Sequence, residues 1–144
     1  MNRMLHPSLG EAPVPGGDVF NLDQRRAIDR ARLDANRSSG LTFHVYVGAG
    51  GDNPRSAARA MLRELPNGDS GVLVLVDPVG KALEIVTGSQ ARRLLDDAAC
   101  ALVTLSMQGA FAAGDLAGGI AHGLHQLGDH ARRPQTLHEQ QQAP

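Results

Sequence analysis

The sequence predicts a single α/β domain in which helices cover a mixed four-stranded sheet. The strongest observation is the segment GVLVLVDPVGKALEIVTG, residues 71–88, which has the pattern of two strands joined by a tight turn. Asp, Pro and Gly stand at the first, second and fourth positions of that turn, where a type I turn favours each of them. Strand-like and helix-like segments alternate on both sides of this hairpin, and 144 residues suffice for one domain with one core.

The N-terminal part of the chain predicts an arm, a helix and a strand. Residues 1–18 are rich in proline and glycine, so we expect a flexible arm before a domain that spans residues 19–131. Asn21, with Gln24 three positions later, has the pattern of a capping box, and the helix that it starts should end at the Ser-Ser-Gly sequence. Residues 41–47 alternate between two sets of side chains, as expected for a strand.

The central part predicts a second helix followed by the hairpin. Asn53 and Pro54 form a typical helix start, a cap followed by a first-turn proline, and Pro66 ends this helix. Residues 71–76 are almost entirely apolar, which is typical of a strand buried on both faces. Residues 81–87 include a lysine and a glutamate, so the second strand of the hairpin should be partly exposed.

The C-terminal part predicts two more helices with a strand between them. We expect a short helix over 89–97, a strand over 101–107, a helix over about 112–130 and a disordered polar tail over 132–144. Because glycine weakens a helix, the glycines in the last helix suggest a close approach to another backbone or to a ligand.

The order of these elements fixes the expected sheet. Two strands joined through a helix within one sheet are normally parallel, so strand 41–47 should run parallel to 71–76. The hairpin then reverses the direction for 81–87. The helix over 89–97 would return the chain for a fourth strand over 101–107, parallel to 81–87.

Composition excludes several classes of function. The formal net charge is −1, there is no tryptophan and aromatic residues are few, which argues against a nucleic-acid surface. No segment reaches the ~18 uncharged apolar residues of a membrane span, and no signal peptide is apparent, so we expect a soluble cytoplasmic protein without an integral membrane segment. Cys100 is the only cysteine, which fits a reducing compartment and a buried structural role.

Three segments together resemble the TPM domain family, named for a thylakoid lumen protein, a photosystem repair protein and a membrane receptor modulator. They are VDPVGKALEIVTG, LLDDA and FAAGDLAGGIAHGL, and the resemblance, to a compact bacterial branch, covers about residues 20–131. It implies a mixed sheet with helices on its faces, divalent cation binding as in some members, and a proposed acid phosphatase activity as in others. The aromatic residue that commonly follows the Gly-Asp pair is Leu116 here. The matched positions are Asp77, Lys81, Gly88, Leu95, Asp97, Phe111, Gly114, Asp115 and Gly119.

The expected topology brings carboxylates together at one edge of the sheet. Asp52, Asp77, Asp96 and Asp97 would lie there, beside the glycine-rich segment 48–51. Carboxylates and backbone carbonyls are the ligands that Ca²⁺ and Mg²⁺ prefer. We therefore expect Asp77, Asp97 and Asp52 to hold a divalent cation, with no organic cofactor; the alternative is that these residues only cap turns and helices.

A second site is expected at the opposite edge. Asp115 would lie near Gly88 and Ser89, where Arg92 and Arg93 are close enough to hold an anion such as phosphate. Capping alone could also explain the serine.

Other patterns point to chemistry less specifically. The GAGG segment lacks the spacing of a nucleotide loop, and no nucleophile elbow is present, so Ser106 should be structural. His122, His125 and Asp129 share a helix face without an obvious fourth metal ligand. The resulting hypotheses are a binding or regulatory module for a protein partner or a small anion, with a possible cation; a metal-dependent phosphatase; and a purely structural interaction partner.

Overall fold

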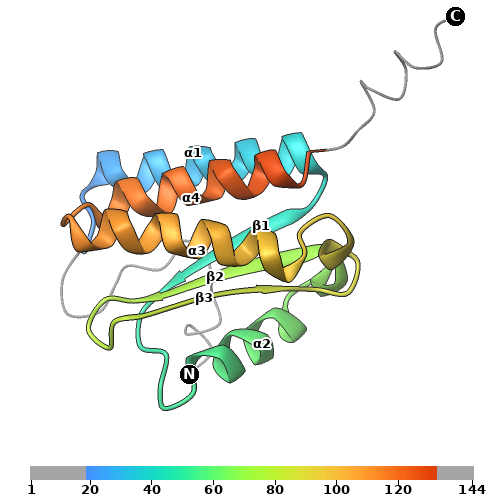
Figure 1. The fold of residues 1–144 in the computed structure, drawn as a ribbon, viewed down its shortest axis with the longest axis horizontal. Coiled ribbons are helices and arrows are strands. Elements are labelled where there is room, and N and C mark those ends of the chain that lie inside the picture. The colour runs from blue at the N-terminus through green and yellow to red at the C-terminus, as the bar shows by residue number, and fades with distance from the viewer. Residues whose placement is uncertain (1–18, 133–144) are drawn as a thin grey trace, which may run out of the picture.

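The computed structural model describes residues 19–132 as nine helical and strand elements around one sheet (Figure 1). The arm predicted over 1–18 and nearly all of the tail predicted over 132–144 lie outside the described residues. In chain order the elements are α1 (Leu22–Ser39), β1 (Thr42–Val47), α2 (Pro54–Glu64), the 3₁₀ helix η2 (Gly68–Ser70), β2 (Gly71–Asp77), β3 (Ala82–Thr87), the 3₁₀ helix η3 (Ala91–Arg93), α3 (Asp97–Ala112) and α4 (Leu116–His130).

The sheet has three strands in the order β1-β2-β3 within the described part of the chain. β1 pairs in parallel with β2, and β2 pairs antiparallel with β3, as the hairpin pattern and the strand-helix-strand order predict. Every residue of the central strand β2 is buried, which confirms that the apolar run 71–76 is covered on both faces. The prediction of a fourth strand is wrong.

Residues 101–107 belong to helix α3 rather than to a strand. Cys100, Val103 and Met107 are its buried residues, and their spacing of three and four is that of one helix face. The Asp96 side chain accepts a 2.9 Å hydrogen bond from the Ala99 amide and starts the helix. A short apolar run cannot be assigned to helix or strand from periodicity alone, and the cap places it in a helix.

The segment before α3 also differs from the prediction. The helix expected over 89–97 is only the three-residue 3₁₀ helix η3, which is too short to carry the chain back across the sheet. Asp96 and Asp97 therefore stay at the end of the sheet where β3 finishes, opposite the β2–β3 turn (Figure 1).

The core consists of two apolar layers on the two faces of the sheet. Helices α1, α3 and α4 lie side by side over one face, and α2 covers the other (Figure 1). The larger layer includes Phe43, Val74 and Leu124; the smaller one includes Leu62 and Leu73. Val19 to Arg132 thus form a three-layer α/β arrangement.

Helix α4 packs closely between α1 and α3 because of its glycines. A Cβ at Gly123 would lie 2.5 Å from the Met107 sulfur of α3, and one at Gly128 would lie 2.9 Å from the Ala35 Cα of α1. Both contacts are closer than a real Cβ tolerates. The predicted close approach at these glycines is therefore an approach to neighbouring helices. No helix in the part of the chain described is long and apolar enough to cross a membrane.

Candidate functional site: an arginine-lined pocket

A polar cavity lies where β2 begins and β3 ends. Its volume is about 740 Å³, within the range typical of small-ligand sites. Three arginines line it, Arg59 and Arg63 from α2 and Arg92 from η3. The remaining lining residues come from α2, the η2 loop, the end of β3 and the segment after it: Leu62, Asn67, Gly68, Asp69, Ser70, Thr87, Gly88, Ser89 and Gln90.

Backbone contacts hold the two loops of this pocket together. The Gln90 amide donates a 2.8 Å hydrogen bond to the Asp69 carbonyl, and the Gly88 amide donates a 2.9 Å hydrogen bond to the Gly71 carbonyl. A Cβ at Gly88 would overlap the carbonyl oxygens of Gly68 and Asp69. Glycine is therefore required at position 88, because only a hydrogen atom fits between the backbone there and the backbone of the η2 loop.

The pocket arginines have no ion-pair partner within residues 19–132. The ion pairs in that range join Asp29 to Arg32, Asp34 to Arg37, Glu84 to Arg55 and Asp129 to Arg132. Arg59 and Arg63 are four positions apart on α2 and lie on the same helix face. With three arginines and one aspartate, Asp69, the lining carries a net formal charge of +2. This excess positive charge favours an anionic ligand.

Part of this site could be anticipated from the sequence. Gly88, Ser89 and Arg92, predicted to hold an anion, all line the pocket, whereas Arg93 is not among its lining residues. Arg59 and Arg63 were missed. The signal for them is their four-residue spacing on a helix that ends at this edge of the sheet.

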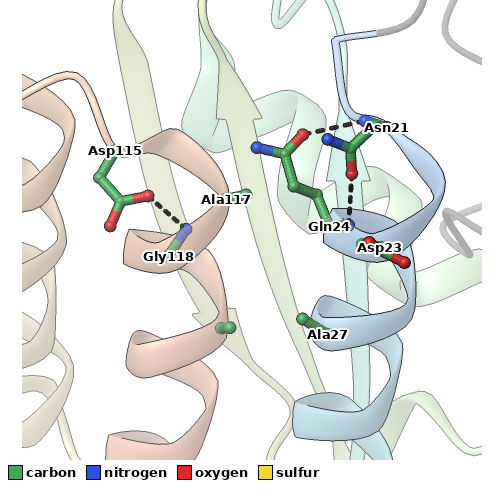
Figure 2. A pocket seen from close by; sticks show the side chains of 8 residues that line it. Asn21, Asp23, Gln24, Ala27, Asp115, Ala117 and Gly118 are labelled. Carbon is green, nitrogen blue, oxygen red and sulfur yellow. Dashed lines mark hydrogen bonds between the residues drawn. The ribbon is translucent and has the colours of Figure 1, made fainter.

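Asp115, predicted beside Gly88, lies instead at the turn between α3 and α4. Its side chain accepts a 2.9 Å hydrogen bond from the Gly118 amide and caps α4. It lines a smaller cavity of about 260 Å³ between the N-termini of α1 and α4. In Figure 2 the Asn21 and Gln24 side chains on the other wall complete the predicted capping box. The Asn21, Gln24 and Asp115 side chains bond to the backbone at the start of their own helices, so capping explains their positions at this cavity.

Asp77 lies at the end of the sheet opposite the arginine-lined pocket and is only 8% exposed. One of its carboxylate oxygens accepts a 2.8 Å hydrogen bond from the Gly80 amide, and the other accepts a 2.9 Å hydrogen bond from the Gly50 amide. The bond from Gly80, followed by that from Gly50, lowers the pKa of Asp77 below its ordinary value. The carboxylate thus joins the hairpin turn to the glycine-rich loop.

The structure does not bring Asp52, Asp77 and Asp97 together. Asp52 is exposed in the loop before α2, and Asp97 is in the first turn of α3 at the other end of the sheet. No group of three or more His, Cys, Asp or Glu side chains suited to a metal ion occurs among residues 19–132. The exposed residues His122, His125 and Asp129 of α4 do not form such a group either.

Cys100 faces the core from α3. Burial, followed by the nearby carboxylate of Asp97, raises the pKa of its thiol to about 11. The thiol is therefore protonated near neutral pH and is a poor nucleophile, which agrees with the predicted structural role.

The fold and the pocket define a small mixed-sheet α/β domain with a cationic cavity at one sheet edge. A family model described as "Domain of unknown function (DUF5130)" matches residues 8–128, and the chain belongs to this family. The uncharacterised proteins Rv2468c and MT2543, from two strains of Mycobacterium tuberculosis, are each 32% identical over 115 residues. The match covers 80% of this chain and 65% of each relative, so the chain spans about two thirds of their length.

A solved structure has the same fold. The N-terminal domain of the cg2496 protein from Corynebacterium glutamicum, determined by solution NMR, aligns with a TM-score of 0.66. The alignment covers 78% of this chain and 74% of that chain at 18% sequence identity. At this level of identity the similarity concerns the fold alone.

Proposed function

We propose that this domain is a binding module of TPM type that takes up a small oxyanion, of the phosphate class, in the arginine-lined pocket. The observation that carries the proposal is the convergence of Arg59, Arg63 and Arg92 on one cavity without ion-pair partners in the described chain. A guanidinium presents its donors as a planar fork that matches the oxygens of a phosphate group.

The rest of the lining suits the same ligand. The hydroxyl groups of Thr87 and Ser89 can donate hydrogen bonds to oxyanion oxygens, whereas the Ser70 hydroxyl donates to the Asn67 carbonyl. The single carboxylate of Asp69 disfavours a highly charged ligand relative to one that also offers a hydroxyl or ammonium donor. A phosphate ester with a small polar substituent therefore fits the lining better than a bare polyphosphate.

The sequence also suggested a metal-dependent phosphatase. Such an enzyme needs carboxylates that place a cation beside the phosphate, and no observation in the pocket favours this arrangement. Hydrolysis is tested in a separate assay. Turnover of p-nitrophenyl phosphate that is abolished by chelation and by Arg63→Gln would show that the domain is an enzyme rather than a binding module.

The test is titration calorimetry of the full chain with inorganic phosphate, compared with chloride at equal ionic strength. We expect saturable phosphate binding that Arg63→Gln weakens at least about tenfold, because one charge-assisted contact contributes roughly 1.5–3 kcal/mol. Arg26→Gln, an exposed arginine of α1, is the matched control and should leave the affinity unchanged. Equal weakening by both variants, or no phosphate binding, would contradict the proposal.

A further inference from the structure

Helix α3 presents an outer face that is both exposed and uncharged. Its residues recur at spacings of three and four, as on one side of a helix. Leu102 and Leu105, at its centre, are 60% and 66% exposed. All seven residues of the face are exposed: Ala98, Ala101, Leu102, Leu105, Gln108, Gly109 and Ala112.

The opposite face of the same helix is already used. Cys100, Val103 and Met107 pack into the larger core layer. α3 is therefore apolar on both sides, which is typical of a helix covered on both sides. α1 differs, since its surface carries the ion pairs Asp29–Arg32 and Asp34–Arg37.

Gly109 provides an independent observation. A Cβ built on this residue meets nothing within 4 Å, and its backbone is helical. Glycine is the poorest helix former after proline, and nothing in the fold requires it here. At Gly123, by contrast, the fold leaves no room for a Cβ. The presence of glycine at position 109 is explained if another backbone approaches the outer face closely.

The pattern of the outer face suits a second copy of the chain as that neighbour. Ala98 and Ala112 lie seven positions on either side of Leu105, and Ala101 and Gly109 lie four positions on either side. Small residues thus stand at equal distances from a central leucine in both directions. A two-fold axis through Leu105 would bring each small residue against a small residue of an antiparallel copy.

We propose that the outer face of α3 is the interface of a homodimer, in which two antiparallel α3 helices cross at Leu105. Leu105 would contact its own counterpart, and Leu102 would pack beside Gly109 of the second copy. The face has no charge that self-association would bury unpaired. The antiparallel arrangement also places opposite ends of the two helix dipoles side by side.

The first test is sedimentation equilibrium of the full chain over a range of concentrations. We expect a dimer whose dissociation constant Leu105→Glu raises by about 100-fold, because the variant buries two like charges at the axis. Leu33→Glu is the matched control, since Leu33 is an exposed leucine of α1; it should leave the dimer intact. A monomer at all concentrations, or equal effects of the two variants, would overturn the proposal.

Disulfide formation gives a second test that does not depend on a destabilising change. In a Cys100→Ala background, Leu105→Cys should form an intermolecular disulfide under mild oxidation, because residue 105 meets itself on the axis. Ala98→Cys alone should not, whereas a mixture of Ala98→Cys and Ala112→Cys chains should.

These patterns separate the alternatives. If another segment of this chain, such as residues 1–18, covered α3, the protein would stay monomeric and Leu105→Cys would not crosslink. Crosslinking of Ala98→Cys to itself would indicate a parallel pair. Either result would overturn the antiparallel dimer.

Discussion

The charged residues at the two ends of the sheet differ in whether they have bonding partners within the protein. At the β2–β3 turn, Asp77 is buried, and each of its carboxylate oxygens accepts a hydrogen bond from a backbone amide. At the other end, Arg59, Arg63 and Arg92 surround a cavity and take part in none of the ion pairs found in residues 19–132. A charge with complete hydrogen bonding stabilises the fold, whereas charges gathered without partners are available to a ligand.

Replacement of Asp77 should give the largest loss of stability. Asp77→Ala leaves the Gly50 and Gly80 amides without their acceptor, and we expect it to lower the free energy of unfolding by about 2–3 kcal/mol. Urea denaturation would measure this, and phosphate affinity should stay unchanged. Asp52→Ala, in the exposed loop nearby, is the control, with an expected change within about 0.5 kcal/mol. If both variants had the same small effect, the structural account of Asp77 would fail.

The stability of the protein should also depend on acid through Asp77. Its pKa is lowered in the folded protein, chiefly by the Gly80 amide and then by the Gly50 amide. The stabilisation is therefore complete above the unfolded pKa of about 4 and is lost as the pH falls through the lower folded pKa. Asp77→Asn should flatten the decrease in unfolding free energy below about pH 4. An unchanged acid slope in this variant would show that other carboxylates dominate.

The smallest expected effect is a gain in stability at the same end. Lys81 adopts a left-handed backbone with φ 57°, which is costly for a residue with a Cβ. Lys81→Gly should raise the free energy of unfolding by about 0.5 kcal/mol, since relief of strain exceeds the added flexibility of the unfolded chain. Thermal denaturation would detect this, and a lower melting temperature would contradict it.

Much of the fold follows from local patterns. The hairpin, the capping box at Asn21 and the strand at 42–47 were predictable because turn chemistry, caps and alternation are short-range signals. Residues 101–107 were not, because a seven-residue apolar run satisfies both a buried strand and a two-sided helix. The outer face of α3 creates this ambiguity, since it lacks the polar residues that would reveal a helical period.

The site was less predictable than the fold. Ser89 and Arg92 are near each other in the chain, so their place in one pocket was predictable. Arg59 and Arg63 join them only through the packing of α2 against the sheet. Asp97 was placed at the wrong edge because the helix predicted over 89–97 would have carried the chain back to the β2–β3 turn, whereas the three-residue η3 leaves it where β3 ends.

The most direct test of the central claim is a two-dimensional NMR titration of the uniformly ¹⁵N-labelled protein with inorganic phosphate, against a sodium chloride control of equal ionic strength. The account predicts saturable shifts of the Ser70, Ser89 and Gln90 amides at the arginine-lined end. The Gly50 and Gly80 amides bonded to Asp77 should not move. Shifts confined to the Asp77 end, or no saturable shift at Ser89 and its neighbours, would contradict the account.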